Sequence, residues 1–146
     1  MDQNLKWNNG FNFTSQIRGH ELTIDAALAV GGTNRGPTPK ELLLTGIAGC
    51  SAMDAIAYLK KHKQDLLDLN IKTNAELTTT NPKHFTFVHL VYQFMGDSLN
   101  QDHVIKSIES SMTKYCGVSY MISKTCPITY SIELNGTKIF DGIAKF

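Results

Sequence analysis

The feature that most limits how this chain can fold is a long apolar helix predicted close after its first quarter. Residues 38–41 (Thr-Pro-Lys-Glu) have a capping residue, proline at the first helical position and glutamate three residues after the cap. The helix is expected to continue from Leu42 to Leu59 and to end near Lys63. Because its first half is apolar on every side, the pattern predicts an enclosed helix, and the rest of the chain must surround it.

Alternating apolar and polar residues predict strands on both sides of this helix. Strands are expected over 11–17, 20–24, 71–80 and 84–94, and a final hairpin turns at 135–136. A second helix is expected from a cap at Ser98 or Gln101 to about Tyr115, and Cys116-Gly117 ends it. Apolar residues on both faces of 84–94 predict a strand covered on both sides. This order predicts an α+β fold with mostly antiparallel strands.

Length and charge limit the class of protein. A chain of 146 residues fits a single domain, residues 1–146. The formal net charge of +1 gives no reason to expect a nucleic acid or a membrane as partner. No signal peptide is recognised and no apolar run approaches the ~20 residues that span a bilayer. The three sparse cysteines are most simply explained as reduced thiols, so a cytoplasmic protein is expected. An all-apolar helix is hard to bury against one sheet in so small a domain, which predicts a homodimer.

The cysteines are the functional groups in unusual positions. The chain has three, without a CxxC pair or a Cys/His spacing suited to zinc, and its five histidines are scattered. No nucleotide-binding loop, HExxH or GxSxG motif is present, so no cofactor and no metal are expected. Cys50 lies about three turns inside the apolar helix, where it is either a small core residue or a reactive thiol. A reactive Cys50 needs a nearby cation, and Arg18 and Arg35 are the only arginines.

Two motifs resemble the OsmC/Ohr superfamily of osmotically inducible and organic-hydroperoxide-resistance proteins. The first is residues 36–44 (Gly-Pro-Thr-Pro-Lys-Glu-Leu-Leu-Leu) followed by Gly49-Cys50, and the second is Cys116-Gly117-Val118-Ser119. Asp25 and Asp54 resemble the YhfA-like branch of that superfamily. The resemblance implies a single OsmC-like domain and an intertwined homodimer, in which strands of both subunits wrap two long central helices and the active sites lie at the interface.

The resemblance also implies roles for individual residues. Cys50 corresponds to the peroxidatic cysteine and Cys116 to the resolving cysteine of a peroxidase that reduces organic peroxides and is recycled by an external dithiol. Arg35 is the candidate cation, with Arg18 as the other choice, and Glu41 is the candidate carboxylate that orients it. Lys40 occupies the position of the family's glutamate. Apolar walls for the substrate are expected from Met53, Phe87 or Met112.

Four residues and two alternative functions stay open. Asp54, one turn after Cys50, would raise the pKa of the thiol unless a cation neutralised it, and it has no assigned role. Cys126 is expected to be a bystander, and Gly46 and Gly49 to allow tight packing around Cys50. The first alternative function is a non-peroxidatic protein that binds a small apolar or thiol-containing ligand at the dimer interface. The second is a stress-associated protein without chemistry of its own.

Overall fold

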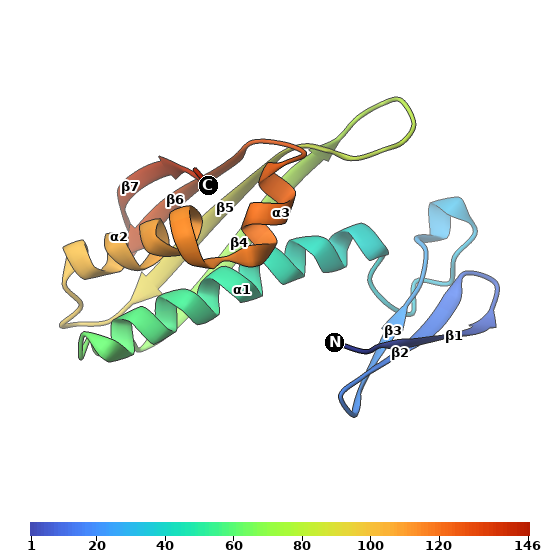
Figure 1. Cartoon of the computed structure of the whole chain (residues 1–146), viewed down its shortest axis with the longest axis horizontal. Coiled ribbons are helices and arrows are strands. Elements are labelled where there is room, and N and C mark those ends of the chain that lie inside the picture. The colour runs from blue at the N-terminus through green and yellow to red at the C-terminus, as the bar shows by residue number, and fades with distance from the viewer. The chain divides into compact units, whose positions relative to one another are not determined.

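A computed structural model describes all 146 residues and divides the chain into two compact units, Met1–Thr45 and Gly46–Phe146. The boundary falls inside the long helix α1 (Pro39–Lys61), as Figure 1 shows. Each unit is described by itself. The elements are helical and extended in roughly equal measure, which confirms the α+β prediction.

The N-terminal unit contains a three-stranded antiparallel sheet. Its strands are β1 (Asn4–Asn9), β2 (Asn12–Ile17) and β3 (His20–Ile24), in that order. The turns between them have positive φ at Gly10, Arg18 and Gly19. A short 3-10 helix, η1 (Leu28–Val30), follows β3.

The glycine-rich loop before α1 is held by the buried carboxylate of Asp25. This group accepts hydrogen bonds from the hydroxyl and backbone N–H of Thr33 and from the backbone N–H groups of Ala26 and Arg35. These bonds, the Thr33 hydroxyl first, outweigh desolvation and lower the pKa of Asp25 from 3.8 to about 2. At Gly36 a Cβ atom would lie 2.3 Å from the carbonyl oxygen of Thr23, so only glycine allows this close approach.

The C-terminal unit has a four-stranded sheet in the order β4-β5-β6-β7. The strands are β4 (Asp68–Leu77), β5 (Phe85–Met95), β6 (Ile128–Leu134) and β7 (Thr137–Ile143). All neighbouring pairs are antiparallel except β5 and β6, which are parallel. The predicted hairpin turn is confirmed, with positive φ at Asn135 and Gly136.

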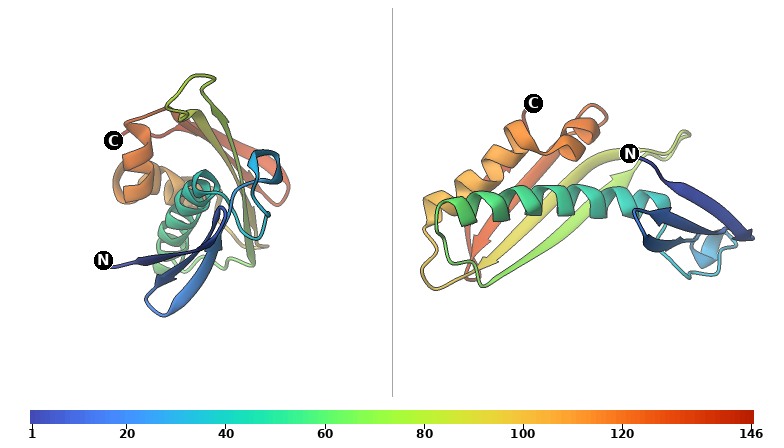
Figure 2. Two further views of the ribbon diagram at one scale, coloured as in Figure 1. Left: turned by 90° about the vertical axis from the view of Figure 1, so that its right-hand side faces the viewer. Right: turned by 60° about the horizontal axis from the view of Figure 1, so that its bottom comes forward.

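The parallel pair is joined by a helical connection that the sequence predicted only in part. It consists of α2 (Gln101–Ser110), the π-helical turn η2 (Ser111–Tyr115) and α3 (Gly117–Ser123). The cap of α2 is Asn100, whose side chain accepts from two backbone N–H groups, so the predicted caps Ser98 and Gln101 are wrong. Helix α3 was not predicted: Cys116 starts a helix as well as ending one. In Figure 2 the helices of this unit lie on one face of the sheet.

The core of this unit lies between that face and the helices. Strand β5 contributes the fully buried Val88, Leu90, Tyr92 and Phe94. Residues on its other face, such as His89 and Val91, are only half-buried. The predicted cover on both faces of this strand is therefore wrong for the single chain.

Helix α1 is buried along one side only. Its buried residues are Ile47, Ser51, Ala55 and Leu59, whereas Met53 is 73% exposed. The prediction of a fully enclosed helix is thus wrong for the isolated chain. The expectation that no apolar run approaches membrane-spanning length is also wrong, because α1 is long and apolar enough, by length and composition, to cross a bilayer. Core helices of water-soluble proteins meet the same criterion.

The two glycines near Cys50 are less tightly packed than predicted. A Cβ on Gly46 would lie 3.9 Å from a side-chain carbon of Val118, an ordinary contact. A Cβ on Gly49 would meet nothing within 4 Å. Tight packing within the chain therefore does not explain Gly49.

Candidate functional site

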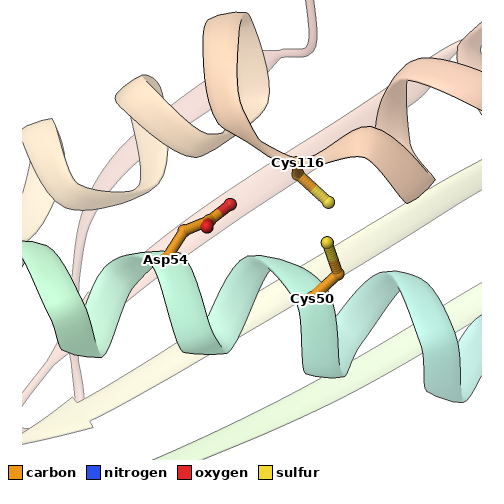
Figure 3. Close-up of side chains that lie close together, drawn as sticks. All are labelled: Cys50, Asp54 and Cys116. Atoms are coloured by element: carbon orange, nitrogen blue, oxygen red, sulfur yellow. The ribbon is translucent and has the colours of Figure 1, made fainter.

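Two helices bring the predicted cysteine pair together. Cys50 lies on α1, and Cys116 lies 66 residues later at the start of α3. Both are free thiols, and their sulfur atoms point toward one another within 4.8 Å (Figure 3). A disulfide needs about 2.05 Å between sulfurs, so a modest side-chain or backbone shift would join them. The sulfurs are neighbours, as the motif resemblance implied.

Cys116 caps the N-terminus of α3 with its sulfur atom. The sulfur accepts hydrogen bonds from the hydroxyl of Ser119 at 3.0 Å and from its backbone N–H at 3.3 Å. Burial raises the pKa of the Cys116 thiol, the two Ser119 bonds lower it, and the neighbouring Cys50 raises it again. Because Cys116 is completely buried and Cys50 is partly exposed, solvent reaches Cys50 first.

Asp54 is the third member of this cluster. It lies one helical turn after Cys50, and its carboxylate is within 4.8 Å of both sulfurs (Figure 3). The buried hydroxyl of Ser111, in η2, donates a hydrogen bond of 2.8 Å to it. No Lys, Arg or His nitrogen lies within 4.0 Å of this carboxylate; the single salt bridge of the chain joins Lys138 and Asp141. The cluster therefore has acidic and thiol groups but no paired cation.

The other predicted site residues belong to the N-terminal unit. The backbone N–H of Arg35 donates to Asp25, which fixes the loop that carries it. The carboxylate of Glu41 accepts from the backbone N–H of Thr38 at 2.6 Å, and this bond lowers its pKa. This bond is the glutamate half of the predicted capping box, and it engages Glu41 at the helix start. Residues 46–146 contain no arginine, so a guanidinium for Cys50 must come from residues 1–45 of this or another copy.

A cavity of about 320 Å³ lies beside Asp54. It is lined from α1, α2 and η2 by Asp54, Ala57, Tyr58, Lys61, His62, Ser107, Ser110 and Tyr115. None of the predicted apolar wall residues lines it: Met53 is exposed, Met112 is in the core and Phe87 is half-buried on β5. This cavity is more polar than the predicted peroxide pocket.

Two residues have structural roles. Cys126 is buried, is not part of the cluster, and has its pKa raised by burial alone. His89, on β5, bonds to the hydroxyls of Thr129 and Ser131 across the sheet, as expected for a satisfied histidine.

The sequence did not reveal the partners that orient the cluster. Ser119 is part of the second motif, but its bonds to a sulfur atom depend on α3, a helix of seven residues with glycine at its first position. Ser111, which donates to Asp54, is the first residue of the π-helical turn η2. An i, i+4 spacing of Cys50 and Asp54 was the one visible signal.

Comparisons with known proteins point in one direction. The model of the family described as OsmC-like protein matches residues 32–131, a segment that crosses the boundary between the two units. Protein YhfA of Escherichia coli is 31% identical over 135 residues, covering 92% of this chain and 98% of YhfA.

Two solved structures show the same fold at lower identity. An organic hydroperoxide resistance protein OsmC from Legionella pneumophila superposes with a TM-score of 0.69 at 20% identity, covering 91% of this chain and 97% of that one. A proposed organic hydroperoxide resistance protein from Vibrio cholerae, with captopril bound in one of its active sites, superposes with a TM-score of 0.66 at 15% identity. The match covers 95% of this chain and 94% of that one.

Proposed function

Because this chain belongs to the OsmC-like protein family, we propose that it is a thiol-dependent peroxidase that reduces organic hydroperoxides with Cys50 and Cys116. The observation that carries the proposal is the pair of free sulfurs facing each other within 4.8 Å. Three free cysteines also fit the reducing cytoplasm, where a dithiol reductant is at hand.

The proposed cycle has three steps. The Cys50 thiolate attacks the peroxide O–O bond, the distant oxygen leaves as alkoxide and takes a proton to become the alcohol, and Cys50 becomes a sulfenic acid. The Cys116 sulfur then attacks that sulfur, and water leaves as the disulfide forms. An external dithiol exchanges with the disulfide, which returns both thiols and oxidises the reductant to its own disulfide.

Burial supports this division of roles. Peroxide must reach the first sulfur, and Cys50 is partly exposed whereas Cys116 is fully buried. The second sulfur must be nucleophilic without meeting substrate, and two hydrogen bonds from Ser119 point at Cys116. The two cysteines thus differ in exposure and in hydrogen bonding in the way that the proposed cycle requires.

The attacking thiolate also needs a cation. In this proposal Arg35 supplies it, since arginine is absent from residues 46–146 and the loop that carries Arg35 is fixed by Asp25. The Glu41 carboxylate is bonded to the backbone N–H of Thr38, so the loop, and not Glu41, orients the Arg35 guanidinium in this proposal.

The test uses the reduced, metal-free protein and cumene hydroperoxide. Stoichiometric peroxide should remove two of the three thiols, and mass spectrometry should find a reducible link between Cys50 and Cys116. Cys50→Ser should stop consumption, and the matched variant Cys126→Ser should consume peroxide like the parent. If Cys50→Ser consumes peroxide as fast as the parent, the proposal fails.

A second candidate function is ligand binding without turnover. The cavity of about 320 Å³ beside Asp54 favours it, because this volume is at the small end of ligand pockets. The captopril complex of the Vibrio cholerae protein is a precedent in that protein for a small molecule in the active site. This function predicts that both thiols survive peroxide and that a small thiol compound such as captopril raises the melting temperature.

A further inference from the structure

The peroxidase cycle uses two members of the cluster and leaves the third, Asp54, without a role. Its carboxylate and the sulfurs of Cys50 and Cys116 all lie within 4.8 Å of one another, and Figure 3 shows them directed at a common space. Thiolate sulfur and carboxylate oxygen are ligands that Zn²⁺ accepts in proteins. The three side chains therefore form a donor set for a thiophilic divalent cation.

The spacing along the chain hides this set. Cys50 and Asp54 share one face of α1 at i and i+4, while Cys116 comes from the connection between two parallel strands. No run of Cys and His at zinc-finger spacing is needed when the fold brings distant residues together. The expectation of no metal rested on chain spacing alone.

Hydrogen bonds hold two of the three donors from outside. The Ser111 hydroxyl donates to Asp54 at 2.8 Å, and the Ser119 hydroxyl and N–H donate to the Cys116 sulfur. Partners of this kind orient metal ligands and sharpen their affinity. Each of these bonds leaves the remaining lone pairs of its acceptor free for a metal.

Charge and access also suit a cation. The carboxylate has no Lys, Arg or His nitrogen within 4.0 Å, so it forms no salt bridge. Asp54 also lines the cavity of about 320 Å³, together with Lys61 and His62, so an ion can reach the donor set from the Asp54 side. An entry path is one of the requirements of a functional site for a metal.

We propose that the reduced protein binds one Zn²⁺ through Cys50, Asp54 and Cys116, with a fourth position open toward the cavity. With Zn–S of about 2.3 Å and tetrahedral geometry, neighbouring ligand atoms lie roughly 3.5–3.8 Å apart, so the donors, now within 4.8 Å of one another, must approach by up to about 1.3 Å. The same two sulfurs cannot hold zinc and form a disulfide, so bound zinc protects the pair and disulfide formation releases it; this last consequence rests on the proposed peroxidase.

The test measures metal on reduced protein in the absence of peroxide. Dialysis against buffered Zn²⁺ and elemental analysis should give one ion per chain, and Co²⁺ should give a thiolate-to-cobalt charge-transfer band. Cys50→Ser and Cys116→Ser should lose stoichiometric binding. Asp54→Asn should weaken zinc affinity by at least about 10-fold, because removing a residue that only hydrogen-bonds a metal ligand already costs about that much. The matched variant Cys126→Ser should bind like the parent.

Several outcomes overturn the site. They are equal binding by Asp54→Asn and the parent, equal loss in Cys126→Ser and Cys50→Ser, or zinc retained after diamide has joined Cys50 to Cys116. Circular dichroism and the melting temperature of the metal-free variants establish that each is folded, and Cys50→Ala repeats the test with a non-polar replacement. Peroxide consumption is assayed separately on chelator-treated protein, so either proposal can fail while the other stands.

Discussion

At the residue scale, Ser119 is the residue whose hydrogen bonds lower the pKa of the buried Cys116 thiol. Ser119 offers Cys116 both its hydroxyl and its backbone N–H, and these are the only groups that oppose the rise in the Cys116 pKa caused by burial. A side-chain substitution removes the hydroxyl and leaves the backbone bond. The two donors are therefore separable by mutation.

Ser119→Ala should slow disulfide formation without slowing the first attack on peroxide. Loss of a hydrogen bond to a charged sulfur costs about 1.5 kcal/mol, which is about 10-fold in the population of the Cys116 thiolate at neutral pH. Stopped-flow measurements should show a Cys50 sulfenic acid that persists about 10 times longer and is trapped by dimedone.

The control for this experiment is Ser123→Ala on the same helix. The Ser123 hydroxyl donates only to the carbonyl of Tyr120 on the exposed side of α3, so its loss should leave the sulfenic acid lifetime unchanged. Equal lifetimes in Ser119→Ala and the parent would contradict the role given to Ser119.

The sequence carried part of this site. Cys50 and Cys116 were identified from two motifs, and the structure brings their sulfurs together. The sequence alone assigns no role to Asp54, because it does not show that Cys116 lies close to this carboxylate in the fold. Ser111 could not be identified at all, since a π-turn has no sequence signature comparable to a cap or a glycine turn.

At the element scale, α1, α2 and every strand except β1 were predicted from local patterns, whereas β1, η2 and α3 were not. Alternation and turn residues define β2, β3 and the β6–β7 hairpin because each depends on neighbours a few residues away. Helix α3 depends instead on a sulfur cap, and cysteine is not a recognised capping residue. The burial of α1 depends on what surrounds it, which no local pattern contains.

The glycine loop is the element whose stability should depend most on acid. Its Asp25 has a pKa of about 2 in the folded chain against an ordinary 3.8, so the unfolded chain binds protons first. Stability from this group is complete above 3.8 and is lost as the pH falls toward 2.

Asp25→Asn should therefore destabilise the N-terminal unit at neutral pH, and the difference from the parent should shrink as the pH falls below about 4. Fluorescence of Trp7, the single tryptophan, reports on this unit during denaturant unfolding at each pH. The exposed Asp2→Asn serves as the matched control. A constant difference between Asp25→Asn and the parent at every pH would contradict this account.

At the scale of the whole molecule, the single chain leaves apolar surface on its longest helix. Met53 is 73% exposed and the space over Gly49 is open, although α1 has the composition of a buried helix. A second copy would cover this side. The dimer expected from the sequence thus stays a prediction, now with a defined surface.

Light scattering should give twice the chain mass of 16.2 kDa, and Met53→Asp should shift the protein toward the monomer because a charge would be buried. The matched variant Met121→Asp changes another exposed methionine, on α3, and should leave the mass unchanged. A parent protein that runs at the single-chain mass at micromolar concentration would refute the prediction.

The parallel pairing of β5 and β6 has a consequence during synthesis. Parallel neighbours require the chain to return along the sheet, and Cys116 lies on that return path, 66 residues after Cys50. At ribosomal rates of about 5–20 residues per second, Cys50 is made roughly 3–13 s before its neighbour. During that interval the nascent chain carries the Cys50 thiol without its neighbour Cys116, on an apolar helix that the rest of the fold does not yet cover. Chaperones and small-molecule oxidants can therefore react with or bind this segment before folding is complete.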